Sequence, residues 1–158
     1  MAKKSNHNDV YLTSEGLKEL QTELKDLEDK KLPKLVKRVA RARSFGDLSE
    51  NSEYSNAREE LAFAEGRVDE LKELISRAKV IRSKKKKDVV KLGCKVTVHA
   101  NGGEHTFEVV GEWEADPGKK KISHNSPLGK ALLGKKRGET VEIKAPAGKI
   151  IYEIKKIH

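Results

Sequence analysis

The sequence predicts an α+β fold, in which an N-terminal antiparallel helical hairpin is followed by a small antiparallel sheet domain. Three observations support this prediction. Leucines recur at spacings of three and four residues between Leu17 and Leu27, a similar apolar series runs from Tyr54 to Ala78, and apolar residues alternate with polar ones after residue 88. The first two patterns are typical of a coiled-coil seam, and the third is typical of half-buried strands.

The first helix is expected to begin at about Thr13, where Thr13 or Ser14 can act as the N-cap. Its apolar seam slips near Leu32 and resumes at Leu35, and Pro33 lies at the slip. Proline lacks a backbone N–H and clashes with the preceding helical turn. The sequence therefore predicts either a kink or a new helical segment with Pro33 in its first turn.

A turn at 44–47 is expected to separate this helix from a second one, predicted to run from Leu48 to about Lys79. Such a helix is about 48 Å long at 1.5 Å per residue. It contains Gly66, which costs roughly 1 kcal/mol relative to alanine in a helix interior. The apolar positions of this seam are Tyr54, Ala57, Leu61, Ala64, Val68, Leu71, Ile75 and Ala78. The hairpin turn is therefore expected to lie far from the rest of the molecule.

Residues 1–83 are assigned to the hairpin domain and residues 84–158 to a small α+β domain, with a lysine-rich linker at the boundary. Asn101-Gly102-Gly103 is expected to form a hairpin turn. Ser126 is expected to cap a short helix that has Pro127 at its first position. The predicted strands are Lys95–Val98, Thr106–Val109, Thr140–Ile143 and Ile150–Ile154.

The composition excludes several classes of protein. The single cysteine, Cys94, rules out an intrachain disulfide and is expected to be a buried small hydrophobic residue. The five histidines are scattered and indicate no metal cage. No stretch approaches the ~20 apolar residues needed to span a bilayer, and the first residues lack the apolar core of a signal peptide, so a cytoplasmic protein is expected.

The positive charge is unevenly distributed along the chain. Residues 1–83 hold 17 Lys and Arg against 16 Asp and Glu, whereas residues 84–158 hold 17 against 9, and the net charge of the whole chain is +9. A basic surface favours nucleic acid, or an acidic face on a protein, as the partner.

Two carboxylates, Asp47 and Glu50, lie at the predicted reversal of the hairpin. Carboxylate oxygens are the ligands that Mg²⁺ prefers, so the pair could share one metal ion. The same spacing also fits a capping box, with Asp47 as the N-cap and Glu50 at position N3. Two acids are too few for a self-sufficient Mg²⁺ site, and a catalytic role therefore requires further ligands from a partner.

A basic stripe precedes this reversal. Residues 30–43 carry seven basic residues and no acid, and one face of the predicted helix displays Lys30, Lys34, Lys37 and Arg41. Such a stripe can follow an RNA backbone through its phosphates. The alternative is that it pairs with acids of the second helix, namely Glu59, Glu60, Glu65 and Glu70. Only Phe45 and Tyr54 are available nearby for base stacking, so sequence-specific reading of nucleic acid is not expected.

Two motifs carry a resemblance to a known family. The run from Gly46 to Tyr54, GDLSENSEY, resembles the tip signature of the Gre transcript-cleavage factors, GreA and GreB. The run from Ile122 to Lys135, ISHNSPLGKALLGK, resembles the matching stretch of their C-terminal domain. The likeness extends from Leu12 to the final strand. It is closest to GreA, because Leu48 follows the tip aspartate, although the basic stripe is more similar to GreB.

The resemblance implies a non-enzymatic transcription elongation factor that acts on RNA polymerase. In this family the hairpin enters the secondary channel of the polymerase, and the FKBP-like C-terminal domain docks at the channel rim. Asp47 and Glu50 then act at the catalytic centre as ligands of a Mg²⁺ ion held by the polymerase, and the isolated protein needs no cofactor. The polymerase cleaves its own backtracked transcript and resumes synthesis.

The same resemblance implies roles for further residues. Arg43 and Arg58, together with Lys37 and Arg41 of the stripe, are expected to hold the backtracked RNA 3′ segment. Ser126 and Pro127 are expected to meet the polymerase. A monomer is expected because the hairpin buries its own seam. The alternatives are a channel-blocking transcription inhibitor on the same scaffold and a coiled-coil nucleic-acid binder that is independent of polymerase.

Overall fold

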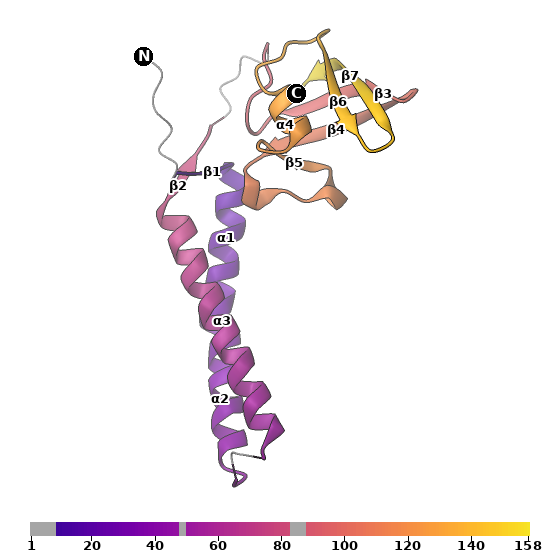
Figure 1. Ribbon diagram of the computed structural model, residues 1–158. Coiled ribbons are helices and arrows are strands. Elements are labelled where there is room, and N and C mark those ends of the chain that lie inside the picture. Colours follow the sequence, from indigo (N-terminus) through magenta and orange to yellow (C-terminus); the bar gives the residue numbers. More distant parts are fainter. Residues whose placement is uncertain (1–8, 48–49, 83–87) are drawn as a thin grey trace. The chain divides into compact units, whose positions relative to one another are not determined.

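The computed structural model describes residues 9–47, 50–82 and 88–158. These residues divide into two compact units, of which one is Leu17–Ala78 and the other combines the residues up to Gly16 with Lys79–His158. The first unit is a helical hairpin and the second contains a mainly antiparallel sheet, so the predicted α+β fold is confirmed (Figure 1). The domain boundary predicted between residues 83 and 84 lies outside the described residues.

The first arm of the hairpin consists of α1 (Ser14–Asp26), a π-helical turn η1 (Leu27–Lys31) and α2 (Leu32–Arg43). In the π-helical turn the backbone N–H of Leu32 donates to the carbonyl oxygen of Leu27, five residues earlier. This wider turn relieves the clash between the ring of Pro33 and the carbonyl group four residues before it. Pro33 thus lies in the first turn of α2, which confirms the prediction of a new segment.

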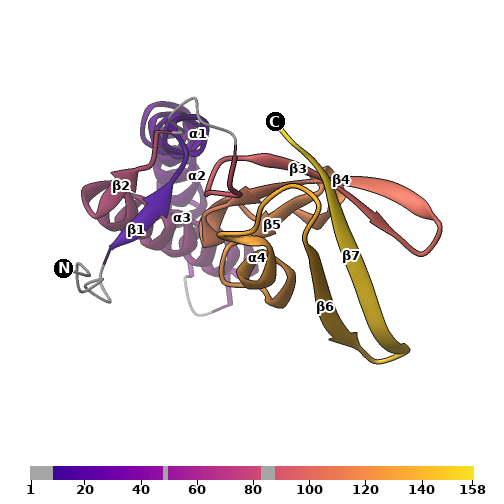
Figure 2. The same cartoon turned by 90° about the horizontal axis from the view of Figure 1, so that it is seen from above.

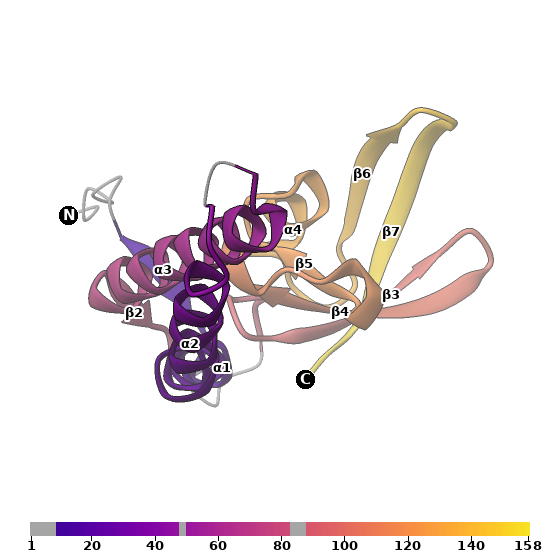
Figure 3. The ribbon, with the colours of Figure 1, turned by 90° about the horizontal axis from the view of Figure 1, so that it is seen from below.

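The second arm is α3 (Ser52–Ser76), and a buried apolar seam joins it to the first arm. Ion pairs show that the arms are antiparallel: Glu23 pairs with Arg67 at 2.8 Å, whereas Arg38, later in the first arm, pairs with the earlier residue Glu60 at 2.7 Å. The buried seam residues are Leu20, Leu27, Leu35, Ala42, Ala57, Ala64, Val68, Leu71 and Leu74. Figure 3 shows α2 and α3 facing each other at the turn end.

Both ends of α3 differ from the prediction. It begins at Ser52 rather than Leu48, and it ends at Ser76 because the next residues form β2 (Ala78–Val80). Strand β2 pairs with β1 (Val10–Leu12), and the N–H of Ile81 donates to the carbonyl oxygen of Leu12 at 3.0 Å. This two-stranded sheet was not predicted, because strands of three residues are too short to show an apolar period.

The second sheet contains five strands in the order β5-β4-β3-β7-β6. Strands β3, β4, β6 and β7 pair in antiparallel fashion, and β5 adds to β4 in parallel. Their bounds are Lys95–Ala100, Gly103–Val110, Lys121–Ser123, Thr140–Ala145 and Gly148–Ile157 for β3 to β7 in turn. The short strand β5 was not predicted. The turn between β3 and β4 is confirmed, and the left-handed φ angles of Asn101 and Gly102 match a type I′ hairpin.

The core of this unit lies between the sheet and a short helix, α4 (Pro127–Leu132) (Figure 2). Val96, Val98 and Ile154 from the sheet are fully buried, as is Leu132 from α4. Cys94 is 3% exposed, which confirms its prediction as a buried small hydrophobic residue. Two 3₁₀ turns, η2 (Glu112–Glu114) and η3 (Pro117–Lys119), connect β4 to β5. No described helix has the length and apolarity required to cross a membrane.

Candidate functional site

The chain reverses direction immediately after α2. The N–H of Ser44 donates to the carbonyl oxygen of Ala40 at 3.2 Å, and the N–H of Phe45 donates to that of Ala42 at 3.3 Å. Gly46 follows with a φ of +114°, a region that residues with a side chain rarely adopt. The last helical turn therefore tightens over Phe45, and Gly46 allows the chain to turn toward α3.

The side chain of Asn51 forms hydrogen bonds with both helices of the hairpin. Its side-chain oxygen accepts a hydrogen bond from the N–H of Tyr54 at 3.0 Å, which caps the first turn of α3. Its side-chain nitrogen donates to the carbonyl oxygen of Ala42 at 2.8 Å, near the end of α2. Helix ends leave such N–H and C=O groups without partners inside the helix. One amide thus satisfies a donor of one helix and an acceptor of the other.

The capping box predicted for Asp47 and Glu50 is wrong. The N-cap of α3 is Asn51, and both acids precede it along the chain. Asparagine prevails here because an amide both donates and accepts, whereas an ionised aspartate only accepts. Both acidic side chains are exposed. Residues 48 and 49, which connect them, lie outside the described part of the chain.

Asp47 and Glu50 carry carboxylate oxygens, the ligands that Mg²⁺ prefers. Within the described residues no group of three or more His, Cys, Asp or Glu could hold a metal ion. Mg²⁺ requires near-octahedral coordination by oxygen and usually takes only one or two protein carboxylates, with the remaining ligands from substrate and water. Asp47 and Glu50 can therefore contribute to a Mg²⁺ site only if another molecule provides the rest of the ligands.

Exposed cations surround the reversal. The predicted RNA-binding residues Lys37, Arg41, Arg43 and Arg58 are all exposed, the first three on α2 and the last on α3. Among the described residues, none of these four has a carboxylate within ion-pair distance. Lys30 pairs with Asp26 of its own arm at 2.6 Å. The alternative that the stripe pairs with acids of the second helix is thus wrong for Lys37 and Arg41.

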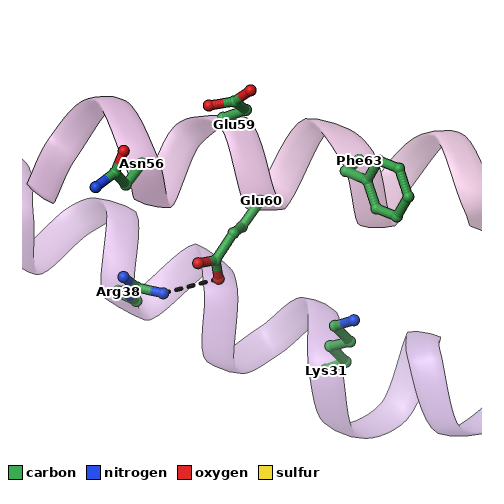
Figure 4. Close-up of a pocket in the computed structure, with 6 residues that line it drawn as sticks. All are labelled: Lys31, Arg38, Asn56, Glu59, Glu60 and Phe63. Carbon is green, nitrogen blue, oxygen red and sulfur yellow. Dashed lines mark hydrogen bonds and ion pairs between the residues drawn. The ribbon is translucent and has the colours of Figure 1, made fainter. Parts of the chain in front are cut away.

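The residue that does pair with acids of the second helix is Arg38, which lies on α2 next to Lys37. Its guanidinium pairs with Glu53 at 2.8 Å and with Glu60 at 2.7 Å, both on α3. Figure 4 shows the second of these ion pairs. These hydrogen bonds, first that of Glu53, raise the pKa of Arg38 above its ordinary value, and Arg38 in turn lowers the pKa of Glu53. Exposed ion pairs add little stability. The geometric effect is to hold the Arg38 guanidinium against α3.

Two shallow hollows flank this ion pair. Figure 4 shows the first, lined by Lys31, Arg38, Asn56, Glu59, Glu60 and Phe63. The second lies closer to the reversal and is lined by Arg38, Arg41, Ala42, Phe45 and Glu53. Each hollow contains one exposed aromatic ring, since Phe63 is 77% and Phe45 is 70% exposed. The sequence identified Phe45 as a candidate for base stacking. It did not reveal that Arg41 shares a hollow with this ring.

Ser126 and Pro127 lie at the start of α4 in the other unit. The Ser126 hydroxyl accepts from the N–H of Gly129 at 3.0 Å and donates to the carbonyl oxygen of Ser123 at 2.7 Å. Pro127 follows at the first helical position and is exposed. The predicted capping role of Ser126 is therefore confirmed. Its role in contacting the polymerase stays a prediction.

Comparisons with known proteins cover both units. Two family models match, "Transcription elongation factor, N-terminal" over residues 10–80 and "Transcription elongation factor, GreA/GreB, C-term" over residues 85–158. The chain is 48% identical over 151 residues to transcription elongation factor GreA of Caldanaerobacter subterraneus subsp. tengcongensis, a match that spans 94% of this chain and 96% of the relative. It is 51% identical over 138 residues to the GreA of Oenococcus oeni, across 85% of each chain.

Among solved structures, the GreA factor homolog 1 (Gfh1) of Thermus thermophilus is 30% identical, with a TM-score of 0.45 and coverage of 95% of this chain and 99% of that one. The family assignment rests on the two family models and on the curated relatives, which match along nearly the whole chain. The chain belongs to the GreA/GreB family of transcription elongation factors.

Proposed function

We propose that this protein rescues stalled transcription by stimulating RNA polymerase to cleave its own backtracked RNA. The observation that carries the proposal is the pair of exposed carboxylates, Asp47 and Glu50, at the reversal of a hairpin that belongs to the transcription elongation factor family. A slender two-helix element can enter the secondary channel of the polymerase and bring these carboxylates to its active centre. The family membership supports the elongation role, and the two carboxylates at the reversal support entry of the hairpin into the channel.

Asp47 and Glu50 provide oxygen ligands to a Mg²⁺ site that the polymerase holds incompletely. When bound there, the metal ion lowers the pKa of a water molecule and steadies the leaving oxygen of the phosphodiester. The protein alone has too few ligands for this chemistry, and it is therefore a cofactor of the polymerase nuclease rather than an enzyme. The exposed cations Lys37, Arg41, Arg43 and Arg58 hold the phosphates of the extruded RNA 3′ segment.

The C-terminal unit anchors the factor to the polymerase. Ser126 and Pro127 contact the rim of the channel, where the rigid start of α4 presents the exposed proline. The basic balance of residues 84–158 favours an acidic protein surface at this contact. The factor acts as a monomer, because its hairpin already buries its own apolar seam, and it works in the cytoplasm with the polymerase.

The test is cleavage of RNA in a backtracked elongation complex with 3′-labelled transcript and Mg²⁺. Wild-type protein is expected to release short 3′ fragments only when polymerase is present. Asp47→Asn and Glu50→Gln keep the side-chain shape but lose the anionic ligand, and each is expected to slow release by at least roughly 10–100-fold without loss of binding. Glu65→Gln, an exposed acid in the middle of α3, is the matched control and is expected to cleave like wild type.

Each alternative has its own outcome in this assay. Unchanged cleavage by both amide variants shows that the tip carboxylates are not metal ligands. A wild-type protein that blocks elongation and releases no fragment is an inhibitor. Tight binding to bare RNA with no effect on polymerase identifies an independent nucleic-acid binder.

A further inference from the structure

Of the two hollows described above, the one closer to the reversal combines an aromatic ring with a cation that forms no ion pair within the described residues. It measures about 380 Å³, which is within the usual range of roughly 300–1,000 Å³ for small-molecule sites. Phe45 is 70% exposed, an unusual position for a large apolar ring in a chain with only 4% aromatic residues. Arg41 lines the same hollow, and within the described residues it forms no ion pair.

The surroundings of Phe45 hold its backbone in place. Its N–H donates to the carbonyl oxygen of Ala42 at 3.3 Å, and the hydroxyl of the preceding Ser44 donates to that of Arg41 at 2.6 Å. Arg38, which lines the other side, is tied to Glu53 at 2.8 Å. The ring therefore projects from a hydrogen-bonded turn, and another residue that lines the same hollow, Arg38, is held by an ion pair. Because the backbone that bears the ring is already ordered, binding a partner costs less conformational entropy than it would at a free loop.

We infer that Phe45 and Arg41 form a stacking platform for one nucleobase of the extruded RNA 3′ segment. The inference rests on the proposed function and adds a binding subsite to it. Every nucleobase has a π-face, so stacking on an aromatic ring or a guanidinium tolerates any sequence. Lys34, Lys37 and Arg41 follow one another along α2 at spacings of three and four residues and lead to Phe45. The phosphates can thus follow the cations while the base occupies the hollow.

Charge favours RNA over a protein surface as the occupant. Helix α2 carries five basic residues and no acid, and four of the five are free of ion pairs among the described residues. A run of unpaired cations that leads to an aromatic ring is typical of single-strand binding surfaces, where a basic groove follows the backbone and rings stack on bases. An apolar anchor for a protein pocket needs no such run of cations.

The test is a thermodynamic cycle that removes the ring and the base separately. Backtracked complexes are prepared with a normal or an abasic 3′-terminal nucleotide, and the factor concentration that gives half-maximal cleavage is measured for wild type and Phe45→Ala. Each single change is expected to raise this concentration roughly 10-fold, and the double change no further, because both remove the same stacking contact. Phe45→Trp is expected to restore wild-type behaviour with the normal base.

The matched control is Phe63→Ala, which removes an equally exposed ring from the other hollow of the hairpin and is expected to change neither value. A second measurement does not depend on cleavage. RNA with 4-thiouridine at its 3′ end, in the Glu50→Gln background, is expected to cross-link within residues 41–45 on irradiation. The cross-link at these residues is expected to weaken in Phe45→Ala.

Three results overturn the inference. Independent effects that multiply to about 100-fold in the double change show that the ring and the base do not touch. An equal loss of binding by Phe45→Ala to complexes with and without extruded RNA assigns the ring to a polymerase surface. A cross-link confined to residues elsewhere places the base at another site. Failure of the proposed function gives a different result from failure of this inference. In that case the wild-type protein releases no fragment, but the cross-link still reports where the base lies.

Discussion

An amide side chain connects the two helices at the turn end of the hairpin. Asn51 accepts from Tyr54 on α3 and donates to Ala42 on α2, so it links two helix ends that belong to different arms. Aspartate and serine are as common as asparagine at the N-cap, but an ionised aspartate lacks the donor that reaches Ala42. Asn51 thus ties the end of α2 to the start of α3.

Removing the two side-chain hydrogen bonds of Asn51 is expected to loosen the turn end of the hairpin without unfolding the apolar seam. Asn51→Ala loses both hydrogen bonds and is expected to lower the free energy of unfolding by about 1 kcal/mol, within the range of roughly 0.5–2 kcal/mol for caps. Asn51→Asp keeps the acceptor for the Tyr54 N–H and is expected to lower the free energy of unfolding by less than Asn51→Ala does. Urea unfolding measures the stability, and hydrogen exchange at the Tyr54 amide reports the cap directly. Asn56→Ala, inside α3, is the control, and equal stability of Asn51→Ala and wild type contradicts this role.

The same residue shows why the tip could be predicted only in part. The sequence places a reversal and two acids near residue 47, and the structure confirms the reversal. Local spacing favours Asp47 as the N-cap of the second helix through its capping box, whereas the structure uses Asn51. The contact that decides between them reaches from Asn51 back to Ala42 in the other helix. Sequence spacing within one helix contains no information about that partner.

At the scale of helices and strands, length determined what could be predicted. The two seams repeat over many turns, and four strands alternate over four or more residues, so all of these elements were predicted correctly in kind. Strands β1, β2 and β5 have three residues each and were missed. Such strands exist because a neighbouring strand satisfies their backbone groups, which is a tertiary effect. The effect of Pro33 could be predicted from the sequence, because a proline disturbs the helix through its own ring and its missing N–H.

Two glycines with ordinary backbone angles are expected to respond to alanine in opposite ways. A Cβ on Gly66 in α3 meets no atom within 4 Å, so Gly66→Ala is expected to stabilise the hairpin by roughly 0.5–1 kcal/mol. A Cβ on Gly129 in α4 lies 2.0 Å from the carbonyl oxygen of Ser123, so Gly129→Ala forces the backbone apart. It is expected to cost about 1–3 kcal/mol as an overpacked site. Thermal unfolding of both variants checks the pair, and a shift of the same sign in both contradicts the packing described for these elements.

Over the whole molecule, the net charge does not show that the basic residues are concentrated in particular segments of the chain. Residues 1–83 are almost neutral, yet residues 30–43 within them carry seven basic residues and no acid. The acids that balance this charge lie largely on α3, where Glu53 and Glu60 are occupied by Arg38, and on the first turns of the hairpin. A partner at this end of the hairpin therefore encounters two exposed acids and a helix on which four of five basic residues form no ion pair within the described part of the chain. Exposed cations of this kind favour a polyanion as the partner.

The salt dependence of binding to a backtracked complex tests this view of the charges. Each phosphate contact on a single strand contributes about 0.7 to the slope of log affinity against log salt concentration. Lys37→Gln on α2 is expected to lower that slope by about 0.7 and to weaken binding at low salt. Lys18→Gln is the matched control, because Lys18 is also exposed and also free of ion pairs among the described residues, but it lies at the opposite end of the first arm. Binding is measured between about 50 and 200 mM salt, the range over which phosphate contacts show their effect. Identical slopes for Lys37→Gln and wild type contradict a phosphate contact at Lys37, whereas an equal decrease in both variants assigns the effect to net charge rather than to the basic stripe.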